Sequence, residues 1–97
     1  MTLPKLEDFK NHQQDDFSIQ FTAEQDGVCQ VKEVSVSKAP ANNQGEQQFS
    51  VVFVHNNPVV FEQGVYSVNH DSLGAFDLFL VPVYGDEHGV HYEAVFT

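Results

Sequence analysis

Apolar and polar residues alternate along most of this chain with a period of two, which is typical of half-buried β-strands. Residues 17–22, Phe-Ser-Ile-Gln-Phe-Thr, show the pattern most simply, and residues 65–69 repeat it over a shorter length. Residues 49–54 are almost continuously apolar, which indicates a central strand with neither face well exposed to water. No long stretch has the period of a helix, so the pattern predicts an all-β protein.

A run of β-branched residues at positions 28–37 changes phase part-way along its length. Cys29 and Val31 share one parity, whereas Val34 and Val36 have the opposite parity. A strand that exchanges its faces in this way usually contains a β-bulge or a sharp bend. We therefore expect a bulge near residues 32–34. Cys29 is the single cysteine, so it has no internal disulfide partner, and its place in the alternation predicts a buried, unreactive thiol.

The last third of the chain has the pattern of a β-hairpin. Residues 75–82 are apolar on both parities for most of their length, which predicts a strand that runs through the middle of the fold. Residues 84–89 contain Gly-Asp-Glu-His-Gly, a strong turn signal. Residues 90–96 then alternate, so this return strand is expected to face solvent on one side.

The two segments with the least strand character are residues 1–15 and 38–48. Residues 6–9 are predicted to form one helical turn with Thr2 as a candidate cap, and residues 38–48 a mobile loop. Gly- and Asp-containing turns are expected at 24–27 and 70–74. The predicted strands are 17–22, 28–37, 49–54, 65–69, 75–82 and 90–96. Together they indicate one domain over residues 1–97, a small six-stranded antiparallel barrel or sandwich with one short N-terminal helical turn.

Charge narrows the range of partners. The formal net charge is -10, the chain has no Arg, and all four Lys precede residue 39. Binding to nucleic acid is therefore not expected, because it depends on neutralising phosphates with Lys and Arg. The acidity keeps the protein soluble or, alternatively, forms a negative face for a basic partner or a cation. No apolar run approaches the roughly 18 residues of a membrane span and no signal peptide is apparent, so we expect a cytoplasmic protein that does not bind membranes.

Several blocks of the sequence carry a resemblance to other proteins. They are residues 49–53 (Phe-Ser-Val-Val-Phe), 63–66 (Gln-Gly-Val-Tyr), His70 with Leu73-Gly74, 78–83 (Leu-Phe-Leu-Val-Pro-Val) and 92–96 (Tyr-Glu-Ala-Val-Phe), together with Leu6-Glu-Asp-Phe9 and Phe17. With these blocks the chain resembles an uncharacterised family of short bacterial proteins, classed as a domain of unknown function. The resemblance implies a compact β domain with no catalytic residues to transfer. The association of this family with phage-tail-like genes implies an assembly or adaptor role.

Carboxylates and imidazoles gather at the predicted hairpin tip. Asp86, Glu87, His88 and His91 are of the types that bind divalent transition metals. The odd spacing of His88 and His91 would place them on opposite faces of a strand, however, and no further firm ligand is apparent. A solvated turn is the alternative reading, so no metal or cofactor is assigned.

The other polar motifs support structural roles. Residues 70–72, His-Asp-Ser, are too close together for a catalytic relay, so we expect Asp71 or Ser72 to bond the turn backbone. The tyrosines are expected in the core: Tyr66, Tyr84 and Tyr92. Four histidines lie in the half without Lys, where acids are expected to strengthen their hold on protons and to make an interface pH-dependent: His55, His70, His88 and His91.

These observations favour a non-catalytic interaction or structural module over an enzyme. Such a module would present an acidic surface or a strand edge to a protein partner, or would self-associate. The alternative is a small-molecule-binding β-barrel, which would enclose a cavity.

Overall fold

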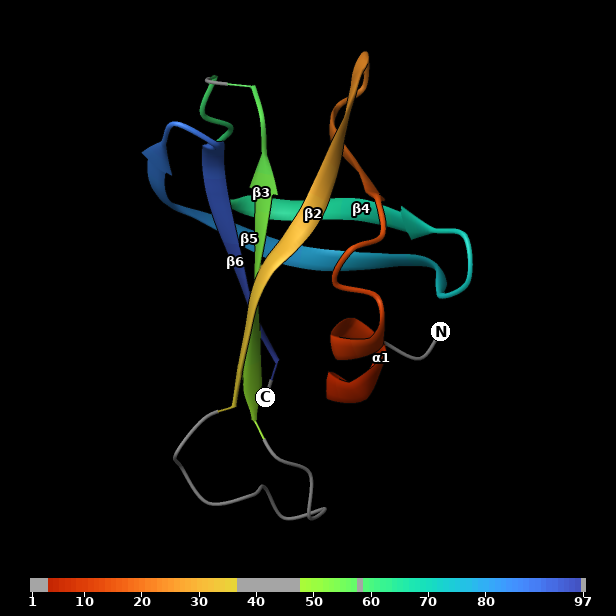
Figure 1. The fold of residues 1–97 in the computed structure, drawn as a ribbon. Coiled ribbons are helices and arrows are strands. Elements are labelled where there is room, and N and C mark those ends of the chain that lie inside the picture. Colours follow the sequence, from red (N-terminus) through yellow and green to blue (C-terminus); the bar gives the residue numbers. More distant parts are fainter. Residues whose placement is uncertain (1–3, 37–47, 58, 97) are drawn as a thin grey trace.

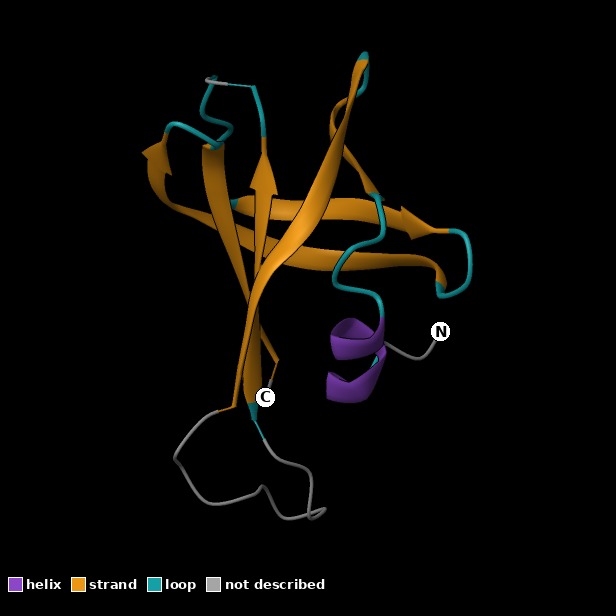
Figure 2. Ribbon diagram, in the orientation of Figure 1, coloured by secondary structure: helices purple, strands orange, loops and turns teal. Residues whose placement is uncertain are grey.

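The structure, a computed structural model, describes residues 4–36, 48–57 and 59–96. Six antiparallel strands form a closed barrel in the order β1-β2-β3-β6-β5-β4, and one short helix lies at one end (Figures 1 and 2). The elements are α1 (Leu6–Asn11), β1 (Phe17–Thr22), β2 (Gln25–Val36), β3 (Phe49–His55), β4 (Gly64–His70), β5 (Gly74–Asp86) and β6 (Gly89–Phe96). The predicted all-β class, strand number and N-terminal helical turn are confirmed, and the barrel replaces the sandwich alternative.

The bulge predicted near residues 32–34 is present in the ladder between β2 and β3. Val31 pairs with Phe53, and Glu33 pairs with the preceding residue of β3, so Lys32 is the extra residue. Cys29 is fully buried on the inner face, as predicted, and burial raises the pKa of its thiol to about 12. The bulge reverses the parity, so that Val34 packs against the same core.

Two further bulges, which the sequence analysis did not predict, bend β1 and β5. The ladder of β1 with β2 shifts at Phe21, and the ladder of β5 with β6 shifts between Pro82 and Tyr84. Pro82 pairs with Tyr92 of the core, whereas Tyr84 pairs with His91. Tyr84 is therefore about half exposed on the outside of the barrel, and the prediction that it lies in the core is wrong.

The two strands of the closing hairpin differ from their predicted environments. Only one face of β5 is buried, the face that carries Phe76, Leu78 and Leu80, and Phe79 on the other face is 53% exposed. The prediction that residues 75–82 have both faces covered is therefore wrong, because a barrel strand has an outer face. The strand β6 was expected to have one face in solvent. His91 lies on that outward face by parity, but it is fully buried.

Aromatic side chains fill both ends of the barrel. Phe9 of α1 is fully buried and its ring lies 5.2–6.2 Å from five other rings, those of Phe17, Phe49, Phe53, Phe76 and Phe96. At the other end, the Phe21 ring stacks against the rings of Phe61 and His55, with Tyr66 and Tyr92 beside it. The N–H of Phe61 donates to the Tyr92 hydroxyl over 3.0 Å, which ties the segment before β4 to the core.

The turn after β1 and the start of α1 differ from the expected ones. The turn after β1 is short, and Gly27 lies inside β2, where a Cβ atom would be 2.6 Å from His55 Nε2. Helix α1 begins after Lys5, whose backbone N–H donates to the Asp8 carboxylate over 2.8 Å. The candidate cap Thr2 lies outside the described residues, as do positions 38–47 of the predicted loop.

Candidate functional site

Three polar side chains meet where α1 joins the barrel. His12 follows the helix, Asp15 lies in the linker to β1, and His70 is the last residue of β4. Asp15 Oδ2 lies 2.7 Å from His12 Nδ1 and 2.9 Å from His70 Nε2. We call this group the His–Asp–His clasp. Among the residues that the structure describes, it is the one group of three potential metal ligands whose donor atoms all lie within 4.8 Å of one another.

The hydrogen bonds of His70 decide what the clasp can do. His70 Nδ1 accepts the backbone N–H groups of Ser72, over 3.0 Å, and Leu73, over 3.1 Å. Nε2 therefore carries the ring proton and donates it to Asp15. A metal-bound histidine has the opposite arrangement, with its second nitrogen donating outward. The clasp is accordingly a hydrogen-bonded connection, and the expectation that Asp71 or Ser72 bonds this turn is corrected: the His70 ring does so.

The clasp joins the linker to the barrel wall. Hydrogen bonds from His12 and then from His70 hold the pKa of Asp15 below its usual value of 3.8. The His70 ring also lies 4.7 Å from the ring of Phe17 in the core. Because His12 directly follows α1, the clasp holds the helix in the position at which Phe9 closes the barrel end.

The residues predicted as metal candidates separate into two pairs at the tip of the β5–β6 hairpin. His91 Nε2 lies 3.0 Å from Asp86 Oδ2, and the Tyr84 ring stacks on the imidazole at 4.1 Å. The contact between His91 and Asp86 does not have the direction of a hydrogen bond. Both ring nitrogens of His91 are therefore buried without a hydrogen bond. His88 and Glu87 are exposed, with 3.7 Å between His88 Nε2 and Glu87 Oε1.

Two opposing effects act on Asp86. Burial raises the pKa of this carboxyl, but contact with the His91 imidazole and a 2.9 Å hydrogen bond from the His88 backbone N–H lower it, and the net pKa is below its usual value. At His55 burial lowers the pKa. The expectation that nearby acids strengthen the hold of this histidine on protons is therefore wrong, because His55 packs among aromatic rings.

The outer surface of β4, β5 and β6 presents apolar side chains to solvent. Val65 of β4 pairs with Phe79 of β5, and they are 68% and 53% exposed. Val95 of β6, which is 64% exposed, lies on the same outer face. We call Val65, Phe79 and Val95 the exposed apolar face. Val65 and Phe79 are adjacent, and neighbouring exposed apolar side chains of this kind are candidates for an interaction surface.

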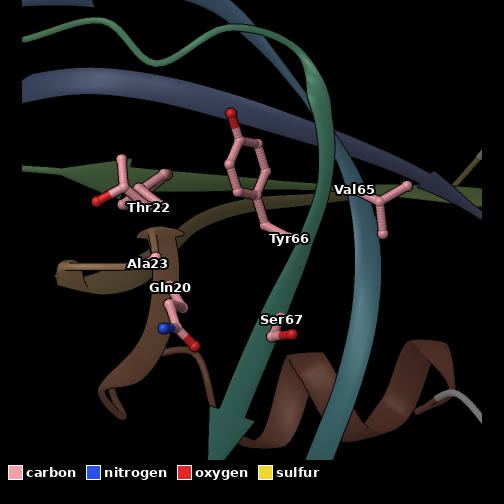
Figure 3. Close-up of a pocket in the computed structure, with 7 residues that line it drawn as sticks. Gln20, Thr22, Ala23, Val65, Tyr66 and Ser67 are labelled. Atoms are coloured by element: carbon pink, nitrogen blue, oxygen red, sulfur yellow. The ribbon is translucent and has the colours of Figure 1, made fainter.

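A shallow groove opens beside Val65, between the end of β1 and the beginning of β4. Its volume is about 260 Å³, and Figure 3 shows β1 and β4 facing each other across it. The lining residues are Gln20, Phe21, Thr22, Ala23, Val65, Tyr66 and Ser67. A second groove of about 200 Å³ shares Gln20 and Ser67 with it and extends over the outer face toward Asp26. We call the two together the β1–β4 groove.

Comparison with known proteins identifies one family. The model of a family described as a domain of unknown function (DUF6916) matches residues 4–96. The chain belongs to this family. No curated protein and no solved structure shows significant similarity to the chain. The family match extends over α1 and all six strands, so the clasp and both surfaces lie within it.

Sequence reasoning missed the clasp for an identifiable reason. His12 and Asp15 are three residues apart in a polar stretch, a weak signal by itself, and His70 follows 55 residues after Asp15. Only barrel closure brings them together.

In the described part of the chain, no helix is long and apolar enough to cross a membrane.

Proposed function

We propose that this protein is a non-catalytic interaction module that binds a basic protein partner on the outer face of β4, β5 and β6. The observation that carries the proposal is the cross-strand pair Val65 and Phe79, two large apolar side chains that are more than half exposed on a closed barrel. An exposed aromatic residue on a rigid strand is a favourable binding anchor, because little conformational freedom is lost when a partner covers it.

Charge supports a basic partner over a second copy of the chain. The chain carries a net charge of -10, and Asp77 and Glu93 lie on the strands that carry the exposed apolar face. Two copies joined through this face would bring their acids together, whereas a partner with Lys and Arg around an apolar centre would complement it. An adaptor of this kind is compatible with the phage-tail-like assemblies that the resemblance implies.

The arrangement of the interior favours an adaptor over the small-molecule-binding alternative. Large side chains such as Phe9, Phe53 and Tyr92 are fully buried in the barrel, and the two grooves lie on its outer surface. The clasp also favours a structural role. Both ring nitrogens of its buried His70 are hydrogen-bonded within the protein, so neither is available to take a proton from a substrate.

Site-specific cross-linking in the native host tests the proposal. A photo-reactive phenylalanine analogue is placed at position 79 and, as the control, at position 36, because Val36 is 45% exposed at the end of β2 and belongs neither to the exposed apolar face nor to the residues that line the grooves. The proposal expects a cross-link from position 79 to one basic protein, no such cross-link from position 36, and loss of binding of that protein in Phe79→Ser. Equal labelling from both positions, or cross-linking only to a second copy of the chain, contradicts it.

A further inference from the structure

The pairing of β1 with β4 ends before either strand ends. The last paired residues are Gln20 and Ser67, although β1 continues to Thr22 and β4 begins three residues earlier, at Gly64. The bulge at Phe21 bends β1 away at this point. Within the described residues, the backbone of positions 64–66 therefore has no strand on the side that faces β1, and the β1–β4 groove opens there (Figure 3).

The other edge of this segment is fully paired. Gly64, Val65 and Tyr66 pair with Leu80, Phe79 and Leu78 of β5, so the segment has a fixed extended conformation. A Cβ atom added at Gly64 would have no neighbour within 4 Å, so the face of β4 from which this Cβ would project is also open at this end of the strand. Three residues of strand extend about 10 Å, which is enough edge for about three residues of a further strand. An open edge held by its neighbour is the usual acceptor for an added β-strand.

We propose that the β1–β4 groove takes an extended, Lys- or Arg-bearing segment of a protein partner, which adds to the open edge of β4. This inference rests on the proposed function and specifies which part of the basic partner is bound. Val65 belongs to both the groove and the exposed apolar face, so one partner reaches both surfaces.

Acidic residues around the groove select the charge of the segment. Asp26 lines the second part of the groove, and Asp77 accepts a hydrogen bond from Ser67 of the groove wall over 3.1 Å. The Tyr66 hydroxyl donates to the backbone carbonyl of Glu62, and burial and then the nearby Glu62 charge raise the pKa of Tyr66, so a third carboxylate lies close to this groove residue. No Lys is among the lining residues. A basic side chain next to the added strand therefore meets opposite charge on both sides of the ladder.

Nuclear magnetic resonance titration with defined peptides tests strand addition directly. The probe is an eight-residue peptide of alternating Lys and Thr; the controls are the same peptide with alternate backbone nitrogens methylated and a peptide of alternating Glu and Thr. We expect the Lys peptide to shift amide signals at positions 20–23 and 64–67, and backbone methylation to weaken its binding about tenfold because ladder hydrogen bonds are lost. Equal binding of the methylated peptide, or shifts confined to other strands, overturns the inference.

Two variants, each of which adds one positive charge, locate the site. Gln20→Lys adds a positive charge inside the groove, and Ser35→Lys adds the same charge on an exposed part of β2. We expect Gln20→Lys to weaken binding of the Lys peptide about fivefold, and Ser35→Lys to weaken it by less than half as much. Equal effects of the two variants contradict a site in the groove.

The two proposals fail in distinguishable ways. If position 79 still cross-links to a basic partner but neither the peptide nor Gln20→Lys affects the groove, strand addition is wrong and the proposed function stands. If position 79 cross-links to no basic protein, the proposed function is wrong, whatever the peptide does.

Discussion

Two buried histidines, His70 at the α1 end of the barrel and His91 at the hairpin end, lie equally close to a carboxylate but are held in different ways. The imidazole–carboxylate distances are 2.9 Å to Asp15 and 3.0 Å to Asp86. His70 uses both ring nitrogens in directed hydrogen bonds, whereas neither nitrogen of His91 makes one. The difference teaches that two contacts of similar length can leave the ring nitrogens of a buried histidine satisfied in one case and without a directed hydrogen bond in the other, and unsatisfied buried nitrogens are costly.

The two ends also differ in how they are closed. At the α1 end a separate helix supplies Phe9, and the clasp holds that helix in place. At the hairpin end the aromatic cluster around Phe21 fills the barrel, and the backbone is also close, since a Cβ added at Gly89, which has a φ of 128°, would overlap the His55 carbonyl. The α1 end is therefore tested by truncating a side chain, and the hairpin end by adding a small atom.

The largest effect is expected for Phe9→Ala. Removing a fully buried ring that packs against five others leaves a cavity, and the free energy of unfolding should fall by about 4 kcal/mol. Urea unfolding monitored by circular dichroism measures it. Val28→Ala, at an exposed position, is the control and should change stability by about 0.5 kcal/mol or less. A loss below about 1 kcal/mol for Phe9→Ala would show that α1 does not close the barrel.

Gly89→Ala examines the hairpin end. The added Cβ would overlap the His55 carbonyl oxygen in addition to requiring a positive φ, so a loss of about 3 kcal/mol is expected. Gly74→Ala is the matched control, because Gly74 also has a positive φ, of 83°, but open space around it, and it should lose about 1 kcal/mol. Thermal and urea unfolding of the two variants compare them, and equal losses would contradict the close contact at Gly89.

Replacing each histidine by leucine tests the comparison between them. His70→Leu leaves the N–H groups of Ser72 and Leu73 without their acceptor, and we expect a loss of about 2 kcal/mol. His91→Leu replaces an imidazole that makes no directed hydrogen bond with an apolar group, and we expect stability to stay within about 1 kcal/mol of the original or to rise. A larger loss in His91→Leu than in His70→Leu would reverse our interpretation of the two ends.

The smallest effect is a pH dependence that arises in the clasp. The folded-state pKa of Asp15 lies below its usual 3.8, so the ionised carboxylate stabilises the native state above that pH, and this contribution is lost as pH falls through the folded-state pKa. Asp15→Asn should therefore lose less stability than the original protein on acidification from about pH 5 to about pH 3. Urea unfolding at a series of pH values measures this, with Asp71→Asn in the neighbouring exposed turn as control. Parallel curves for Asp15→Asn and the original protein would exclude a contribution from the clasp.

Local pattern predicted those parts of the fold that depend on neighbours in the chain. The phase change between Val31 and Val34 located the β2 bulge, because a strand can bury both sets of residues only if an extra residue reverses its faces. The environment of β5 could not be predicted in this way. Apolar residues occupy both parities except at Asp77, so this single polar position was the one sign that Phe79, which shares its parity, faces solvent while Leu80 faces the core.

The sequence by itself determined the all-β class, the six strands, the acidic charge and the buried cysteine, since each follows from local periodicity or composition. Only the tertiary structure decided the closure of the barrel, the clasp of His12, Asp15 and His70, the burial of His91 and the early end of the β1–β4 ladder. The physical reason is that these features depend on register and on the bulges at Phe21 and near Val83. A shift of one residue in register reverses which side chains face inward, and a strand that is apolar at most positions of both parities records the register only weakly.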